Sequence, residues 1–169
     1  MMMTLSEIKI EIDRLAALID ASGYVLPTYG HSEDGARPHI EVDARGYHYV
    51  VVERGQELRR LTTSDLDELL FNVFESVTFS LASKYELAHR IEHQDCRRIL
   101  FRRQVELLSM LSPHWGEREA QSHAETLRQH PFDDNASIRA TLTKDYRDQG
   151  YSPEDASRMA CERYPLEHA

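Results

Sequence analysis

A change of hydrophobic period near residue 63 constrains the fold of this chain more than any other feature of its sequence. Before it, His39–Asp43 alternates apolar and polar residues, and after a short turn the β-branched and aromatic run Tyr47–Glu53 follows, a pattern typical of a β-hairpin. A third, shorter strand is indicated at Gln56–Leu61. After it, apolar residues recur every three or four positions over Leu66–Leu81, which predicts a long amphipathic helix. Because an isolated hairpin is only marginally stable, the sheet must pack on helices.

The N-terminal segment predicts a helix followed by a loop. Thr4 and Glu7 form a capping-box pair, and one apolar stripe runs over Leu5–Ile19. Gly23 is placed to end this helix in a left-handed turn. Residues 24–38 are rich in proline and glycine, so we expect a loop there.

The second half of the chain predicts further helices. Two extend from about Asp95 to Leu111 and from about Trp115 to Gln129, separated by a proline. Two more complete the chain, and Ser152 and Pro153 supply the cap and first position of the last one. No repeat, low-complexity tract or linker divides the sequence. We therefore expect an α+β fold: a mostly helical single domain over residues 1–169, with a small antiparallel sheet of two or three strands packed on the helices.

The composition is that of an acidic globular protein. Hydrophobic residues make up 41% and charged residues 29% of the chain, and the formal net charge is −9. No run approaches the roughly 18–20 consecutive apolar residues of a membrane span, and the N-terminus has no secretory signal pattern. We therefore expect a cytoplasmic protein that does not bind membranes. Negative charge argues against general nucleic-acid binding and suits a basic partner, although it also serves solubility.

The two cysteines, Cys96 and Cys161, both fall in segments that are predicted to be helical. Two cysteines cannot form a disulfide framework, and a cytosolic chain keeps them reduced. We expect each to be a small apolar residue of the core.

Motifs for catalysis are mostly absent from the sequence. The glycines do not cluster into a phosphate-binding loop, and there is no Gly-x-Ser-x-Gly elbow. Neither cysteine has the sequence context of a known nucleophile. A scattered catalytic triad would leave no such trace, so these absences lower the odds of a hydrolase without ruling it out. We expect a protein that is not an enzyme.

One group of side chains could contribute to a metal site. Glu86, His89 and His93 fall at i, i+3 and i+7, so they would share a helix face. The Glu-x-x-His spacing matches half of a carboxylate-bridged di-metal site, but no second such pair occurs. The neighbouring residues are charged and polar, which favours a solvated surface over a metal site. We assign no metal and no cofactor.

A cluster of arginines lies at Arg97, Arg98, Arg102 and Arg103. A nucleic-acid footprint would show a broader basic stripe with interleaved aromatic residues. Asp95 and Glu106 stand three or four residues from Arg98 and Arg102, so they could pair with them on a helix. We therefore expect an ion-pair network.

Contacts with a protein partner are expected from acids on the polar face of the long helix and from aromatic residues outside the apolar stripes. For Trp115, covering the core is the commoner role. The acidic pair at 133–134 could contact a partner, but the favoured role for Asp134 is the N-cap of a helix. The candidates are Tyr29, Glu68, Glu75, Trp115, Asp133 and Asp134.

A series of short stretches between residues 24 and 134 has a familiar order. The stretches are Leu26–Gly30, Pro38–Val42, Tyr47–Gly55, Asp67–Leu70, Val77–Phe79, Tyr85–Arg90, Gln94–Arg98, Gln104–Leu108 and His130–Asp134. Taken in this order, they resemble the immunity protein 63 family of bacterial polymorphic toxin systems. The resemblance implies a small cytoplasmic protein that binds and blocks a toxin encoded beside it, and it brings no catalytic residues to carry over.

We therefore expect an immunity protein that neutralises a cognate toxin domain. An acidic inhibitor suits a basic toxin, particularly a nuclease with a cationic substrate groove. A scaffold or regulatory module with another protein partner is the first alternative. A metal-dependent helical enzyme built around Glu86, His89 and His93 is less favoured. The sequence leaves the oligomeric state open.

Overall fold

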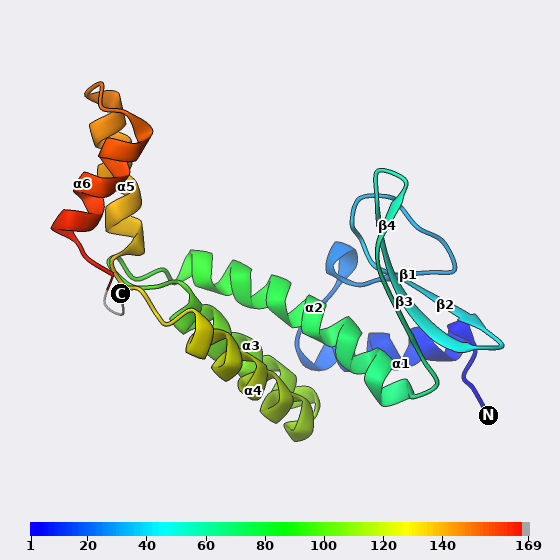
Figure 1. Ribbon diagram of the computed structural model, residues 1–169. Helices are drawn as coiled ribbons and strands as arrows, with labels where there is room; N and C mark the ends of the chain where they lie inside the picture. Colours follow the sequence, from blue (N-terminus) through cyan, green and yellow to red (C-terminus); the bar gives the residue numbers. More distant parts are fainter. Residues whose placement is uncertain (167–169) are drawn as a thin grey trace.

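The computed structural model describes residues 1–166, which contain six α-helices, one short 3-10 helix and four strands (Figure 1). In chain order these are α1 (Leu5–Leu18), η1 (Gly23–Val25), β1 (Thr28–Tyr29), β2 (His39–Asp43), β3 (Gly46–Glu53), β4 (Gln56–Thr63), α2 (Leu66–Ala88), α3 (Arg97–Leu111), α4 (Pro113–Gln129), α5 (Ala136–Asp148) and α6 (Pro153–Arg163). The α+β class expected from the sequence is confirmed.

The sheet is larger than expected and mixed. Its strand order is β1-β2-β3-β4, with β1 parallel to β2 and the other pairs antiparallel. The expectation of two or three antiparallel strands was therefore wrong. The parallel strand β1 spans only Thr28–Tyr29, too short to show a period within the proline- and glycine-rich segment. Strand β4 continues to Thr63. Most of its residues are exposed on both faces, so its sequence shows little alternation between apolar and polar residues.

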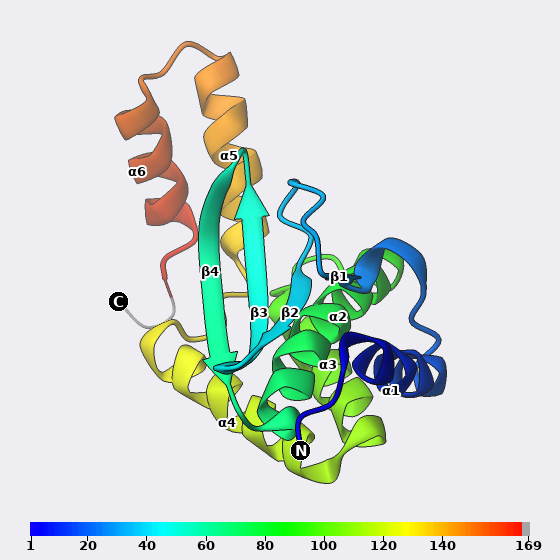
Figure 2. The ribbon, with the colours of Figure 1, turned by 90° about the vertical axis from the view of Figure 1, so that its right-hand side faces the viewer.

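Helix α2 lies between the sheet and the other long helices (Figure 1). The sheet packs against α1 and α2, while α3 and α4 pack on the far side of α2. The core combines side chains from the sheet, from α1 and α2, and from α3. Among them are Ile8, Ile12, Ile40, Tyr49, Leu69, Phe74 and Leu108. Among the described residues, no helix covers the opposite face of the sheet (Figure 2).

The turn between β2 and β3 requires glycine at position 46. Gly46 has φ +135°, a value that L side chains rarely adopt. A Cβ added there would lie 2.4 Å from the carbonyl oxygen of Thr63, at the end of β4. The start of β3 can therefore approach β4 only without a side chain.

The ends of the helices confirm some of the predicted caps and correct another. Thr4 and Glu7 form the expected capping box on α1, and the Ser152 hydroxyl accepts a hydrogen bond from the Asp155 amide at 3.1 Å. Gly23 does not end α1, because the helix stops at Leu18 and Asp20 takes the left-handed conformation with φ +53°. Aspartate tolerates this region better than most residues.

Both cysteines are exposed, so the expectation of core positions was wrong. Cys96 lies in the turn just before α3. Cys161 follows Ala160 on α6, where Ala156 and Ala160 are the fully buried positions. A two-helix hairpin buries only one narrow side of each helix, and Cys161 lies outside it.

The C-terminal helices α5 and α6 form a helical hairpin that projects from one end of the α2, α3 and α4 helices (Figures 1 and 2). The two helices pack chiefly on each other. Within residues 1–166, no helix is both long and apolar enough to cross a membrane.

Candidate functional site

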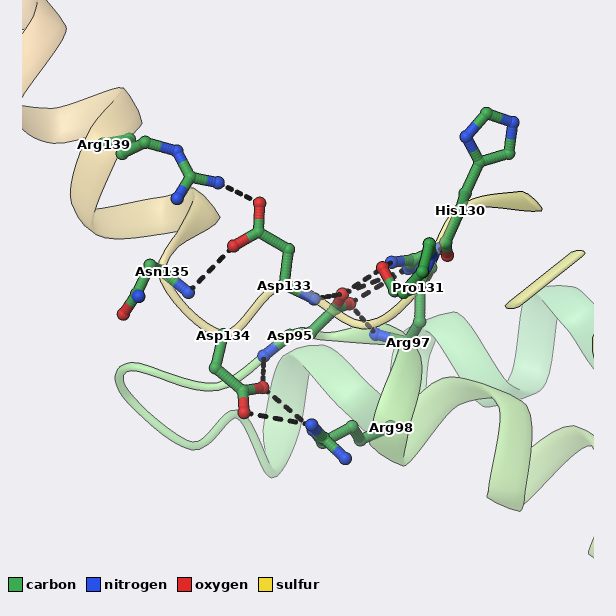
Figure 3. Close-up of polar contacts among 9 residues, drawn as sticks. All are labelled: Asp95, Arg97, Arg98, His130, Pro131, Asp133, Asp134, Asn135 and Arg139. Atoms are coloured by element: carbon green, nitrogen blue, oxygen red, sulfur yellow. Dashed lines mark hydrogen bonds and ion pairs between the residues drawn. The ribbon is translucent and has the colours of Figure 1, made fainter. Parts of the chain in front are cut away.

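Two loops meet where the hairpin joins the rest of the molecule (Figure 3). One is residues 89–96, between α2 and α3, and the other is residues 130–135, between α4 and α5. We call the place where they meet the junction. Its charged residues come from segments almost forty positions apart in the sequence, and hydrogen bonds fix the loops to each other.

Asp95 is the buried centre of the junction. Its carboxylate accepts hydrogen bonds from the Asp133 amide at 2.9 Å and from the Arg97 amide at 2.9 Å. It also forms an ion pair with the Arg97 guanidinium at 2.7 Å. Burial tends to raise the pKa of Asp95, but these hydrogen bonds and the charge of Arg97 outweigh it and hold the pKa below its usual value. Asp95 is therefore ionised at neutral pH.

Asp134 holds the first loop in return. Its carboxylate accepts a hydrogen bond from the Asp95 amide at 2.9 Å and one from Arg98 at 2.8 Å. These bonds lower the pKa of Asp134. The expected N-cap role of Asp134 was wrong, because Asn135 occupies that position and makes no side-chain cap bond. Each loop thus supplies a carboxylate to the backbone of the other.

Arg97 and Arg139 extend the junction in two directions. Arg97 donates to the carbonyl oxygens of His130 and Pro131, each at 2.9 Å. Arg139 is buried on α5, where it pairs with Asp133 and donates to the carbonyl oxygen of Tyr164 at 3.0 Å. Arg139, near the start of α5, therefore connects the loop of residues 130–135 with the segment that follows α6.

A groove with a volume of about 950 Å³ lies beside the junction. Its walls are formed by the two loops, residues 89–96 and 130–135, together with the first half of α5 and Leu166. Its larger apolar side chains are Ile91, Pro131, Phe132, Ile138, Leu142 and Leu166. A hollow of this kind can take up apolar groups of another molecule.

The charged side chains that line the groove already have partners. Arg90 pairs with Glu86 at 2.8 Å. Arg97 pairs with Asp95, and Asp133 pairs with Arg139. The remaining acid is Glu92, which is strongly exposed and lies 3.7 Å from His93. The interior of the groove therefore carries almost no net charge.

The expected arginine network is confirmed. Glu106 pairs with Arg102 at 3.8 Å, as the spacing predicted, and with Arg103 at 3.2 Å. The pair between Asp95 and Arg97, two positions apart along the chain, was not predicted. The sequence did not reveal the bond from Arg98 to Asp134 or the role of Arg139. The available signal was the acidic pair at 133–134 together with the arginine cluster at 97–98, but nothing in the sequence brings these two segments together.

The candidate acids on α2 are already engaged within the molecule. Glu68 forms an ion pair with Arg118 of α4 at 2.6 Å. Glu75 is half-buried, and burial raises its pKa; Glu119 raises it further, while Arg59 and Arg118 oppose the shift. The polar face of α2 is thus partly covered by α4 and β4 rather than open to a partner.

The two aromatic candidates lie toward the core. Trp115 is only 3% exposed, stacks on Phe74, and donates from its indole nitrogen to Asp67 at 3.0 Å. Tyr29 is partly buried in β1, and its buried hydroxyl has no hydrogen-bond partner among residues 1–166. Burial, with a smaller effect of Asp13, raises the pKa of Tyr29 to about 12. Of the candidate contacts, only Asp133 and Asp134 meet at the junction.

The candidate metal ligands do not share a helix face. Helix α2 ends at Ala88, and His93 lies in the following loop with φ +58°. Glu86 is bound by Arg90, while His89 stacks on Tyr85 with ring centroids 4.0 Å apart. Across the described part of the chain, no group of three or more His, Cys, Asp or Glu side chains is arranged to hold a metal.

The fold and the groove define the class of this protein as α+β with an apolar groove beside the junction. Residues 43–125 match the family model described as Immunity protein 63. This match confirms the resemblance to the immunity protein 63 family that the order of the sequence stretches indicated. The match runs from the end of β2 into α4. Neither the curated proteins nor the solved structures give a significant match.

Proposed function

We propose that this chain is an immunity protein that binds a cognate toxin domain in the cytoplasm and blocks it without catalysis. The observation that carries the proposal is the family match over residues 43–125. The junction and its groove support it, because binding to a surface that is already fixed loses less conformational entropy.

The proposed toxin is a nuclease with a cationic substrate groove. The chain has a formal net charge of −9, so it attracts a basic protein at long range. Charge complementarity mainly accelerates association and depends on ionic strength. Rapid capture would protect the cell that makes both proteins.

Co-expression tests the proposal. Cells that produce the toxin domain encoded beside this gene should stop growing, and growth should return when the chain is produced as well. A frameshifted copy of the immunity gene controls for the burden of expression. If growth stays arrested at every expression ratio, the chain is not the immunity protein of that toxin.

A further inference from the structure

The hairpin of α5 and α6 lies outside the segment that matches the family. Its helices have 13 and 11 residues, lengths at which an isolated helix is marginal in water. Its fully buried apolar side chains are the small residues Ala156 and Ala160. Since so little apolar surface is buried within the hairpin, its position depends on the junction.

The groove leaves apolar side chains uncovered on both of its walls. Ile91, in the loop before α3, is 55% exposed, and Phe132 lies in the loop between α4 and α5. Ile138 and Leu142 face them from α5, and Leu166 completes the lining. The volume of about 950 Å³ is near the top of the range for binding pockets, about 300–1,000 Å³. Several apolar side chains of a partner can enter together.

The electrostatics of the groove select the kind of segment that fits. The arginines at 90, 97 and 139 are each matched by a carboxylate, as described above. A charged segment would have to break one of these pairs or lose its hydration without compensation. An uncharged, apolar segment loses little hydration energy, and it gains free energy because it buries apolar surface on both walls of the groove. The neutral groove is thus complementary to a neutral occupant.

We propose that the groove receives an uncharged, apolar segment of the cognate toxin polypeptide, and that the hairpin makes this pairing specific. The inference rests on the proposed function and assigns it a surface. In this arrangement the net negative charge of the whole molecule draws the basic toxin in, and the apolar groove holds it. A toxin with a polar or charged segment at the corresponding place is rejected.

Matched variants test the groove with the toxin domain encoded beside this gene, inactivated at its active site. Ile91→Glu and Leu142→Glu each place a charge in the groove. Met110→Glu and Ile10→Glu place the same charge on apolar residues of α3 and α1 that are exposed outside it. The dissociation constant should rise at least about tenfold for the groove variants, the size of effect expected for buried interface anchors, and stay near the wild-type value for the controls.

A dye provides a test that does not need the toxin. The full chain should enhance the fluorescence of Nile red, an uncharged dye that reports apolar surfaces, and Ile91→Glu should reduce that enhancement more than Met110→Glu. Addition of the inactive toxin domain should displace the dye. Circular dichroism verifies that each variant is folded, and Ile91→Glu is the safer variant because Ile91 lies on an exposed loop.

The outcomes separate the surface from the function. If the wild-type chain binds the toxin domain and the groove variants bind equally well, the groove is not the interface while the immunity function stands. If the wild-type chain binds no toxin, both proposals fall. If the wild-type chain gives no dye signal, the hairpin closes the groove in solution, and the inference is overturned. A wild-type dimer that Ile91→Glu dissociates would make the groove a contact between copies and overturn it too.

Discussion

At the scale of residues, the junction depends on carboxylates that bind backbone amides of the opposite loop. Asp95 accepts the Asp133 amide, and Asp134 accepts the Asp95 amide. The acids at 133–134 stood out in the sequence, but their partners lie almost forty positions away. Spacing of three or four residues predicted that Asp95 and Glu106 pair with Arg98 and Arg102, whereas the pairing of Asp95 with Arg97 and the contacts of Asp134 and Arg139 required the fold.

Asp95→Asn should loosen the junction. The amide keeps one acceptor oxygen but loses the charge that Arg97 binds, so we expect a loss of about 1–3 kcal/mol in the free energy of unfolding or of local opening. Hydrogen exchange and urea unfolding measure the two quantities. Asp145→Asn, an exposed position on α5, is the control. Equal stability of the Asp95 variant and this control would mean that the junction contributes nothing.

The effect of Asp95→Asn should depend on pH. The pKa of Asp95 is lower in the folded protein than its usual value, near 3.9 in an unfolded chain. The ionised carboxylate therefore adds stability above about pH 4, and this contribution is lost as the pH falls through the folded pKa. The stability difference between wild type and Asp95→Asn should therefore shrink steadily as the pH is lowered below about 5. A difference that grows on acidification would contradict the assignment.

Gly46→Ala should destabilise the sheet. The backbone conformation alone costs about 1–3 kcal/mol for a residue with a side chain, and the contact with the Thr63 carbonyl adds to that cost. Gly55→Ala is the matched control, because Gly55 also has a positive φ but no atom within 4 Å of an added Cβ. Thermal unfolding should show a clearly larger loss for position 46. Similar losses at both sites would mean that the contact with Thr63 adds nothing to the cost of the backbone conformation.

At the scale of elements, the strength of the periodic pattern decided what the sequence could predict. Helix α2 and the strands β2 and β3 have long, regular patterns, and all three were predicted. Strand β1 has only two residues and depends on pairing with β2. The groove was not predictable, because its walls come from segments that meet only through the junction.

The hairpin should open more readily than the rest of the protein. Few apolar side chains are buried between α5 and α6, whereas α2 is packed between layers. In native-state hydrogen exchange, amides of α5 and α6 should exchange faster than those of α2 and β3. Binding of the inactive toxin domain should then slow exchange in α5. Protection of the free hairpin equal to that of α2 would contradict this view of the fold.

At the scale of the whole molecule, the single domain over residues 1–169 stays a prediction, and its last three residues lie outside the described range. The net charge was available from composition and predicts a basic partner. Composition could not locate the binding surface, because the acids on α2 that suggested one are paired or half-buried within the fold.

The most direct test of the central claim is a calorimetric titration of the purified chain with the inactive toxin domain encoded beside it. We expect saturable binding at one-to-one stoichiometry, with an association rate, measured separately by stopped flow, that falls as salt is added. The absence of a binding isotherm at both low and physiological salt, with both proteins folded, would contradict the claim that this chain is an immunity protein for that toxin.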